Sequence, residues 1–184
     1  MHNKTPKIFT FVNKYQPNIF DNININVGII YRNYTKAPNF KEILKIKEYC
    51  KKREFKFFIS NDINLALKSK CDGIYIPSFN KTLRLNHKIL SKNFTIMGSA
   101  HNHQEIKQKI NQKCALIFVA PIFKTDKNNK FLDLFKFRLL INGYNKKFIA
   151  LGGINEKNIK KTNMTKISGV GAINFFQKKT GLIS

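Results

Sequence analysis

Short apolar runs recur along this chain at nearly even spacing, and they limit the fold more than any other feature. Each run has four to seven residues, is rich in β-branched and aromatic side chains, and is flanked by polar or glycine-containing segments. These properties are typical of buried strands. The sequence therefore predicts eight strands, at residues 7–12, 25–31, 55–59, 73–76, 94–98, 115–120, 148–152 and 169–174.

Segments with helical spacing lie between most of these runs. The clearest is residues 40–52, and residues 101–110, 131–141 and 155–161 follow the same pattern. Strands that alternate with helices pair in parallel and are buried on both faces. Eight such units predict one α/β domain over residues 1–184, a compact (β/α)8 TIM barrel whose short length requires abbreviated helices. An open, doubly wound sheet is the alternative.

Two of the predicted strands end in glycine-containing segments, "ALGGIN" and "GVGAIN". Glycines at a strand end expose backbone N–H groups, which bind anions such as phosphate. In TIM barrels, phosphate sites often form from the loops after strands seven and eight, where both segments fall. We therefore expect a phosphate site at Gly152, Gly153, Gly171, Ile173 and Asn174. A simple turn at Gly152–Gly153 and a packing role for Gly171 are the alternatives.

The formal charge of +24 raises the question of a nucleic-acid partner. Only four of the 34 basic residues are Arg, the side chain that base-edge recognition favours, and the lysines are spread along the whole chain. Lys, Asn, Ile and Phe, which have A/T-rich codons, make up more than half of the residues. Mutational bias therefore explains much of the charge, and we expect no specific nucleic-acid partner.

The remaining composition favours a cytoplasmic protein without a membrane partner. No apolar run of about 18 residues is present, and the first residues lack the features of a signal peptide. Cys50, Cys71 and Cys114 are widely spaced, so we interpret them as reduced packing residues. The oligomeric state is not predicted.

Several segments together resemble the thiamine-phosphate synthase superfamily, which includes the TenI-like thiazole tautomerases. They are "FFISNDINLALKSKCDGIYI", "GSAHN", "APIFKTD" and "ALGGIN", and they occur in the order and spacing of that family. The resemblance implies a barrel that couples a hydroxymethylpyrimidine diphosphate to a thiazole phosphate in thiamine biosynthesis. It also implies Mg²⁺, which helps pyrophosphate to leave, and a phosphorylated heterocycle as the partner.

The chain departs from the family where the metal would bind. Alignment on "LAL" places Asn61 and Asn80 at the two positions of metal-binding carboxylates, and Asp62 falls one position late. Mg²⁺ prefers anionic oxygen, so we expect weak binding and assign no metal ligand. Asp62 is interpreted as a helix N-cap and Asp72 as a turn residue.

The same resemblance implies the other site residues. Those for substrate binding are Arg32, Ser60, Thr125 and Lys127, with Lys124 as an alternative cation; Ile30 and Tyr34 replace the family's Gln and Lys beside Arg32. His101, preceded by Ser99 at a strand end, aligns with the acid/base histidine of the tautomerases, and opening the next helix is its alternative role.

Three functions remain open from the sequence. The first is a transferase of the thiamine-phosphate synthase type, which the altered metal positions would impair. The second is a metal-independent thiazole tautomerase that uses His101. The third is a non-catalytic relative that keeps only the phosphate site.

Overall fold

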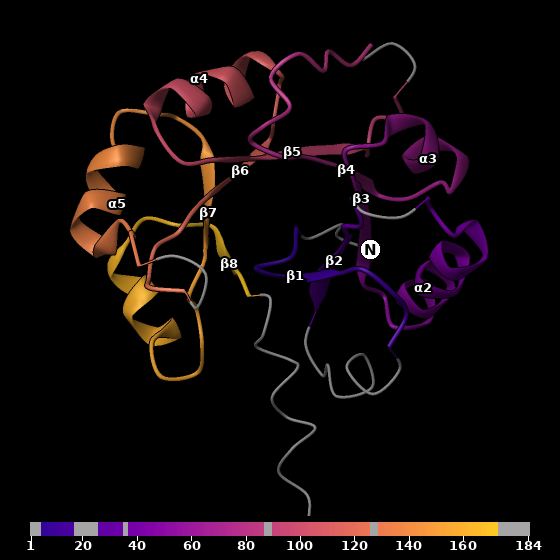
Figure 1. Ribbon diagram of the computed structural model, residues 1–184, viewed down its shortest axis with the longest axis horizontal. Helices are drawn as coiled ribbons and strands as arrows, with labels where there is room; N and C mark the ends of the chain where they lie inside the picture. Colours follow the sequence, from indigo (N-terminus) through magenta and orange to yellow (C-terminus); the bar gives the residue numbers. More distant parts are fainter. Residues whose placement is uncertain (1–4, 17–25, 35–36, 87–89, 126–128, 173–184) are drawn as a thin grey trace, which may run out of the picture.

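A computed structural model describes residues 5–16, 26–34, 37–86, 90–125 and 129–172 of the 184-residue chain. The described residues form eight strands that close into a parallel barrel, in sequence order (Figure 1). The strands are β1 (Ile8–Val12), β2 (Val27–Tyr31), β3 (Lys56–Ser60), β4 (Gly73–Ile76), β5 (Thr95–Ala100), β6 (Leu116–Val119), β7 (Lys147–Leu151) and β8 (Gly169–Gly171).

The barrel closes where the first strand pairs with the last. Ile8 lies opposite Val170 and Phe9 opposite Gly171, and every neighbouring pair of strands is parallel. All eight strands lie at the predicted positions. The prediction of a compact (β/α)8 barrel is confirmed, and the open sheet is excluded by this closure.

The described part of the chain contains four α-helices, and they are short, as expected. They are α2 (Phe40–Lys52), α3 (Ile63–Lys68), α4 (His103–Asn111) and α5 (Asp133–Ile141). The described residues between β4 and β5 contain no helix and consist of turns, bends and irregular segments.

The helix expected at residues 155–161 is different in the structure. A turn comes first, followed by the 3-10 helix η2 (Ile159–Met164). The Asn155 side chain accepts hydrogen bonds from the backbone N–H groups of Lys157 and Asn158, and Asn158 Oδ1 accepts one from Asn155 N. These local bonds compete with α-helical bonds, as short polar side chains do.

Aromatic side chains fill the barrel interior. Phe9, Phe11, Phe58, Tyr75 and Phe118 are buried there with ring centroids 5.1 to 6.1 Å apart, mostly edge to face. Because side chains alternate along a strand, the residues two positions beyond Phe58 and Met97 also face inward. Apolar side chains therefore fill the barrel interior up to the C-terminal ends of the strands, where Ser60 and Ser99 face inward.

The three cysteines are free thiols, as predicted. Cys50 and Cys114 are buried, and burial raises their pKa to about 12, while the pKa of Cys71 is raised to about 11. The thiols are therefore protonated and act as packing groups. Among the described residues, no helix is both long and apolar enough to cross a membrane.

Candidate functional site

The barrel mouth, meaning the C-terminal ends of the strands and the loops that follow them, holds most of the predicted site residues. Active sites of this fold lie at this end, because several loops meet there. The residues that the structure brings to the mouth are Arg32, Ser60, Asn61, Asn80, Ser99, His101, Thr125, Gly152, Gly153 and Gly171. Lys127, Ile173 and Asn174 lie outside the described residues.

The mouth is aromatic and cationic on the side of β2 and β3. The Arg32 guanidinium lies 4.6 Å from the centre of the Phe11 ring. Tyr34 OH and Ser60 Oγ are 2.7 Å apart, and the Tyr34 ring packs edge to face on Phe79, with centroids 5.5 Å apart. Tyr34 and Phe79 stay about half exposed, at 49% and 61%. This side of the mouth therefore offers a fixed cation and two aromatic rings to a ligand.

Asn61 and Asn80, to which the resemblance assigns the metal positions, hydrogen-bond to each other. Asn80 Nδ2 donates to Asn61 Oδ1 over 2.7 Å, and Asn80 Oδ1 accepts from Leu83 N at 3.0 Å. Both amide oxygens are thus occupied, and the carboxylate of Asp62 caps α3 by accepting from Leu65 N. In the described ranges no three His, Cys, Asp or Glu side chains gather closely enough to hold a metal ion. These residues do not fit Mg²⁺.

A buried lysine of α4 holds the backbone around Asn80 through hydrogen bonds. Lys109 of α4 is fully buried, and its ammonium donates to Pro77 O at 2.8 Å, Asn80 O at 2.9 Å and Gln112 Oε1 at 2.9 Å. Gln112 Nε2 also donates to Asn80 O and Leu83 O. The cation therefore joins α4 to the β4–β5 connection directly behind Asn80.

Gly98 on β5 makes room for the stem of this lysine. A Cβ at Gly98 would lie 2.7 Å from Lys109 Cδ and 2.9 Å from Cys114 Sγ. Burial lowers the pKa of Lys109 to about 8, with smaller opposing contributions from Cys114 and Glu105. At pH 7 the side chain is still mainly an ammonium ion, and its three acceptors are uncharged.

His101 lies at the mouth, where hydrogen bonds hold one of its ring nitrogens and its backbone N–H. Nδ1 lies 2.6 Å from Ala120 O, and since a carbonyl can only accept, Nδ1 carries the proton. In the neutral imidazole, Nε2 then has the lone pair that a general base requires. The His101 backbone N–H donates to Glu105 Oε2 at 2.7 Å. The side chain is exposed and precedes Asn102, the N-cap of α4, so His101 itself does not cap the helix.

Ser99 is buried inside the mouth and lies beside Tyr75. Burial raises the pKa of the Tyr75 phenol, and its hydrogen bond with Ser99 opposes this effect. Tyr75 therefore stays protonated and can act only as a neutral hydrogen-bonding group. The Ser99 side chain therefore contacts this phenol at the mouth.

Close backbone contact explains the two glycines after β7. Both have positive φ, +94° at Gly152 and +69° at Gly153. A Cβ at Gly152 would lie 2.7 Å from Pro121 Cβ, and one at Gly153 would overlap the carbonyl oxygen of Lys124. The glycines are thus required by the loop after β6, and this requirement stands whether or not phosphate binds there.

The other residues of the expected phosphate site are partly described. A Cβ at Gly171 would meet Leu151 Cδ1 at 3.0 Å, so this glycine packs against the inner side of the barrel. Asn158 Nδ2 donates to Gly153 O over 2.7 Å, which orders the loop after β7. Thr125 is half-buried beside the same loops.

The predictions from sequence did not include Lys109 or Phe79, and they mentioned Tyr34 only as a replaced residue. A lysine on a polar helix reads as a solvated side chain, so its burial has no local signal. Glu105 was also missed, although Asn102 followed three residues later by Glu is a capping signature that could have identified it.

A parallel eight-stranded barrel with polar groups gathered at its C-terminal mouth defines the class of TIM barrels whose sites are built from the loops after the strands. The sequence profile of the thiamine monophosphate synthase family, TMP-TENI, matches residues 25–175. The chain belongs to this family.

Two curated relatives are named thiamine-phosphate synthase. The one from Prochlorococcus marinus subsp. pastoris is 31% identical over 137 residues, which are 73% of this chain and 39% of that protein. The one from Fusobacterium nucleatum is 25% identical over 144 residues, or 77% of this chain and 70% of that protein. The chain spans less than half the length of the Prochlorococcus relatives that it matches.

A solved structure with the same fold is the thiamine phosphate pyrophosphorylase from Pyrococcus furiosus. The TM-score is 0.69 at 17% sequence identity, and the match covers 91% of this chain and 85% of that one. At this identity the likeness concerns the fold.

Proposed function

We propose that this protein is a transferase of the thiamine-phosphate synthase type. In this reaction the ring nitrogen of a thiazole phosphate forms a bond to the methylene carbon of hydroxymethylpyrimidine diphosphate. The carbon–oxygen bond to the diphosphate breaks, and pyrophosphate leaves with the electron pair. The observation that carries the proposal is the family match over residues 25–175.

Each part of the mouth has a proposed role in binding the two substrates. Arg32 faces an anionic group, while Tyr34 and Phe79 offer rings on which a planar heterocycle stacks. The loop with Gly152 and Gly153 holds the thiazole phosphate. Thr125 lies next to it, and Lys127, Ile173 and Asn174 are assigned to the same region from the sequence alone.

In this proposal, cations of the protein and not a protein-bound metal stabilise the negative charge that develops on the leaving pyrophosphate. The Asn61 and Asn80 side chains are neutral, and their amide oxygens already accept hydrogen bonds from Asn80 Nδ2 and Leu83 N. A fixed cation stabilises developing negative charge without metal. Lys109, directly behind Asn80, and the mouth lysines Lys81 and Lys124 supply that positive potential.

The test is coupling of the two substrates with and without Mg²⁺. We expect slow coupling by the unmodified protein, and faster, Mg²⁺-dependent coupling when Asn61→Asp and Asn80→Asp restore both carboxylates. The control pair Asn93→Asp and Asn111→Asp changes the charge equally at exposed positions outside the mouth. Rapid, strictly Mg²⁺-dependent coupling by the unmodified protein would contradict the metal-free arrangement.

A second function, metal-independent tautomerisation of a thiazole phosphate, is supported by the geometry of His101. With its proton on Nδ1 and a lone pair on Nε2, the ring can remove a proton from the substrate and return it at another atom. We expect a His101-dependent reaction to resist chelator and to fall at least about 100-fold in His101→Asn. His103→Asn, an exposed neighbour, is the control.

The third possible function, that of a non-catalytic relative, predicts a different experimental result. Neither activity would be found, while isothermal titration still detects binding of a thiazole phosphate. Substitution of Gly153 cannot locate that ligand, because any Cβ there meets the Lys124 carbonyl first. Chemical-shift changes at the amides of Gly152 to Ile154 on adding thiazole phosphate are the direct measurement.

A further inference from the structure

Helix α5 is apolar on two opposite faces. Phe137, Leu140 and Ile141 are buried against the barrel. Phe135 and Leu139 point away from it, with 70% and 56% of their surface exposed. A surface helix normally carries polar residues on its outer face, so this outer face is unusual.

The exposed apolar residues of the described chain fall into two groups. Tyr34 and Phe79 pack on each other at the mouth. The other four large exposed apolar residues are Phe131, Phe135 and Leu139, spaced four apart, and Met164 of η2. Figure 1 shows α5 and η2 as neighbouring helices on the outside of the barrel, away from α2 and α3. We call Phe135 and Leu139, which both lie on the outer face of α5 and both line the adjoining cavity, the α5 patch.

A cavity of about 510 Å³ adjoins this patch at the C-terminal end of α5. Phe135, Leu139 and Tyr144 supply apolar and aromatic surface, and Arg138, Lys146 and Lys166 supply three cations. No Asp or Glu is among the residues that line it. The cavity therefore suits an occupant that combines apolar side chains with negative charge.

We propose that the α5 patch and its cavity dock an acidic amphipathic segment of a partner protein. Apolar residues of the partner cover Phe135 and Leu139, while a carboxylate enters the cavity between Arg138, Lys146 and Lys166. Apolar anchors beside complementary charge are the ordinary composition of such interfaces.

Charge excludes two other occupants. A second copy of this chain, which has a net charge of +24, would bring the same cations face to face. Residues 173–184 of the chain contain Lys178 and Lys179 and no Asp or Glu, so they do not complement the cavity either. A separate acidic partner meets both requirements.

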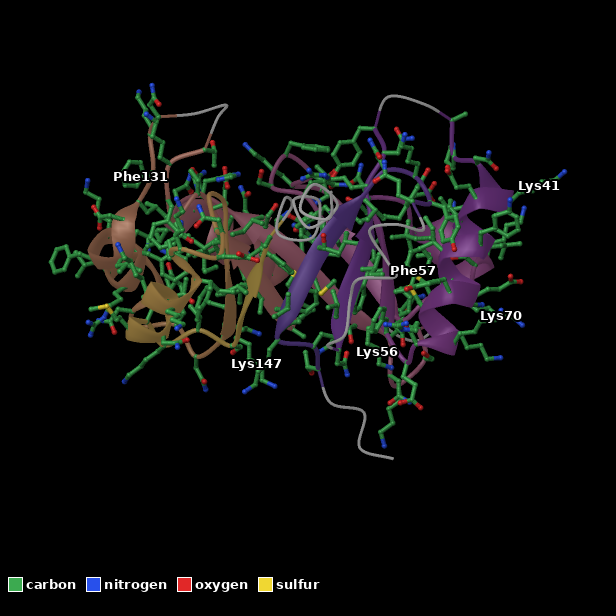
Figure 2. The ribbon with its side chains drawn as sticks, turned by 90° about the horizontal axis from the view of Figure 1, so that it is seen from below. Lys41, Lys56, Phe57, Lys70, Phe131 and Lys147 are labelled. Atoms are coloured by element: carbon green, nitrogen blue, oxygen red, sulfur yellow. The ribbon has the colours of Figure 1, made fainter. Side chains whose placement is uncertain are left out.

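The experiment measures binding of a synthetic helical peptide, of about three heptads with Leu at the core positions and Glu elsewhere, to the full chain. We expect Arg138→Glu with Lys166→Glu to weaken binding at least tenfold. Phe135→Ser with Leu139→Ser should weaken it by a similar factor and should do so at high salt as well. The matched control is Lys41→Glu with Lys70→Glu, which changes the charge equally. Figure 2 shows these two lysines on the opposite side of the molecule from Phe131.

Three results would overturn the proposal. The first is absence of peptide binding, or an equal loss of binding in the control pair, which would show only general attraction to a cationic protein. The second is α5-dependent binding to vesicles of anionic phospholipid in place of the peptide. The third is α5-dependent self-association in sedimentation experiments. A peptide with Lys in place of Glu should not bind.

Discussion

Lys109 is the residue whose environment most affects its chemistry. Its ammonium lies in the protein interior among three uncharged acceptors, and its position behind Asn80 ties α4 to the mouth. Loss of hydration outweighs these contacts, so its pKa falls to about 8. In an unfolded chain the Lys109 ammonium keeps the ordinary lysine pKa of about 10.4.

This difference predicts how stability changes with pH. Between about pH 8 and the unfolded pKa, the unfolded chain binds more protons at Lys109 than the folded one, so this group increases stability as pH rises. We expect the free energy of unfolding of the unmodified protein, relative to Lys109→Met, to increase over that range. Urea unfolding at several pH values measures it. Exposed Lys107→Met is the control, and parallel pH curves for the protein and Lys109→Met would contradict the prediction.

At the scale of one element, α4 controls how His101 is presented. Asn102 Oδ1 accepts from Glu105 N at 2.9 Å, and Glu105 Oε2 in turn accepts from His101 N. This reciprocal arrangement joins the helix start to the strand end before it. The general base proposed for the mouth therefore depends on a helix cap.

Removal of the Asn102 cap should lower the free energy of unfolding by a measurable amount. Asn102→Ala leaves Glu105 N without its side-chain acceptor and should cost about 1 kcal/mol of unfolding free energy. Asn111→Ala, at the exposed last residue of the same helix, removes no cap and should leave stability unchanged or slightly raised, because Ala favours the helix more than Asn does. Thermal or urea unfolding gives both values. A cost that is equal in the two variants would show that the cap does not stabilise α4.

At the scale of the whole molecule, positive charge is distributed rather than gathered. Figure 2 shows Lys41, in α2, and Lys70, just after α3, on one side of the molecule, and Lys147, the first residue of β7, far from them. Dispersed lysines attract polyanions through general electrostatics, without a surface shaped for bases. These lysines lie on different parts of the surface and do not form one basic patch.

The expected consequence is weak binding to duplex DNA that does not depend on sequence. Filter binding or fluorescence anisotropy should show affinity at low salt that is lost at about 0.2 M salt, because few phosphates are neutralised together. Duplexes of different sequence should behave alike. Retention of one sequence over others at that salt concentration would contradict this prediction and would favour a nucleic-acid role.

The sequence by itself determined the strands, their parallel order and the cysteine chemistry, because alternation of buried runs and helices is a local property of the chain. It also identified the family and placed Arg32, Asn61, Asn80, His101 and the glycine pair at strand ends. Strand ends of a closed parallel barrel meet at one mouth, so these residues follow from the fold.

Only the tertiary structure decided what those residues contact. The Asn61–Asn80 hydrogen bond joins positions 19 apart, Lys109 reaches Pro77 across 32 positions, and His101 reaches Ala120 across 19. No local periodicity encodes such contacts, because they depend on how loops from different strands pack at the mouth. The same holds for α5, whose sequence pattern shows two apolar faces but not which of them the barrel covers.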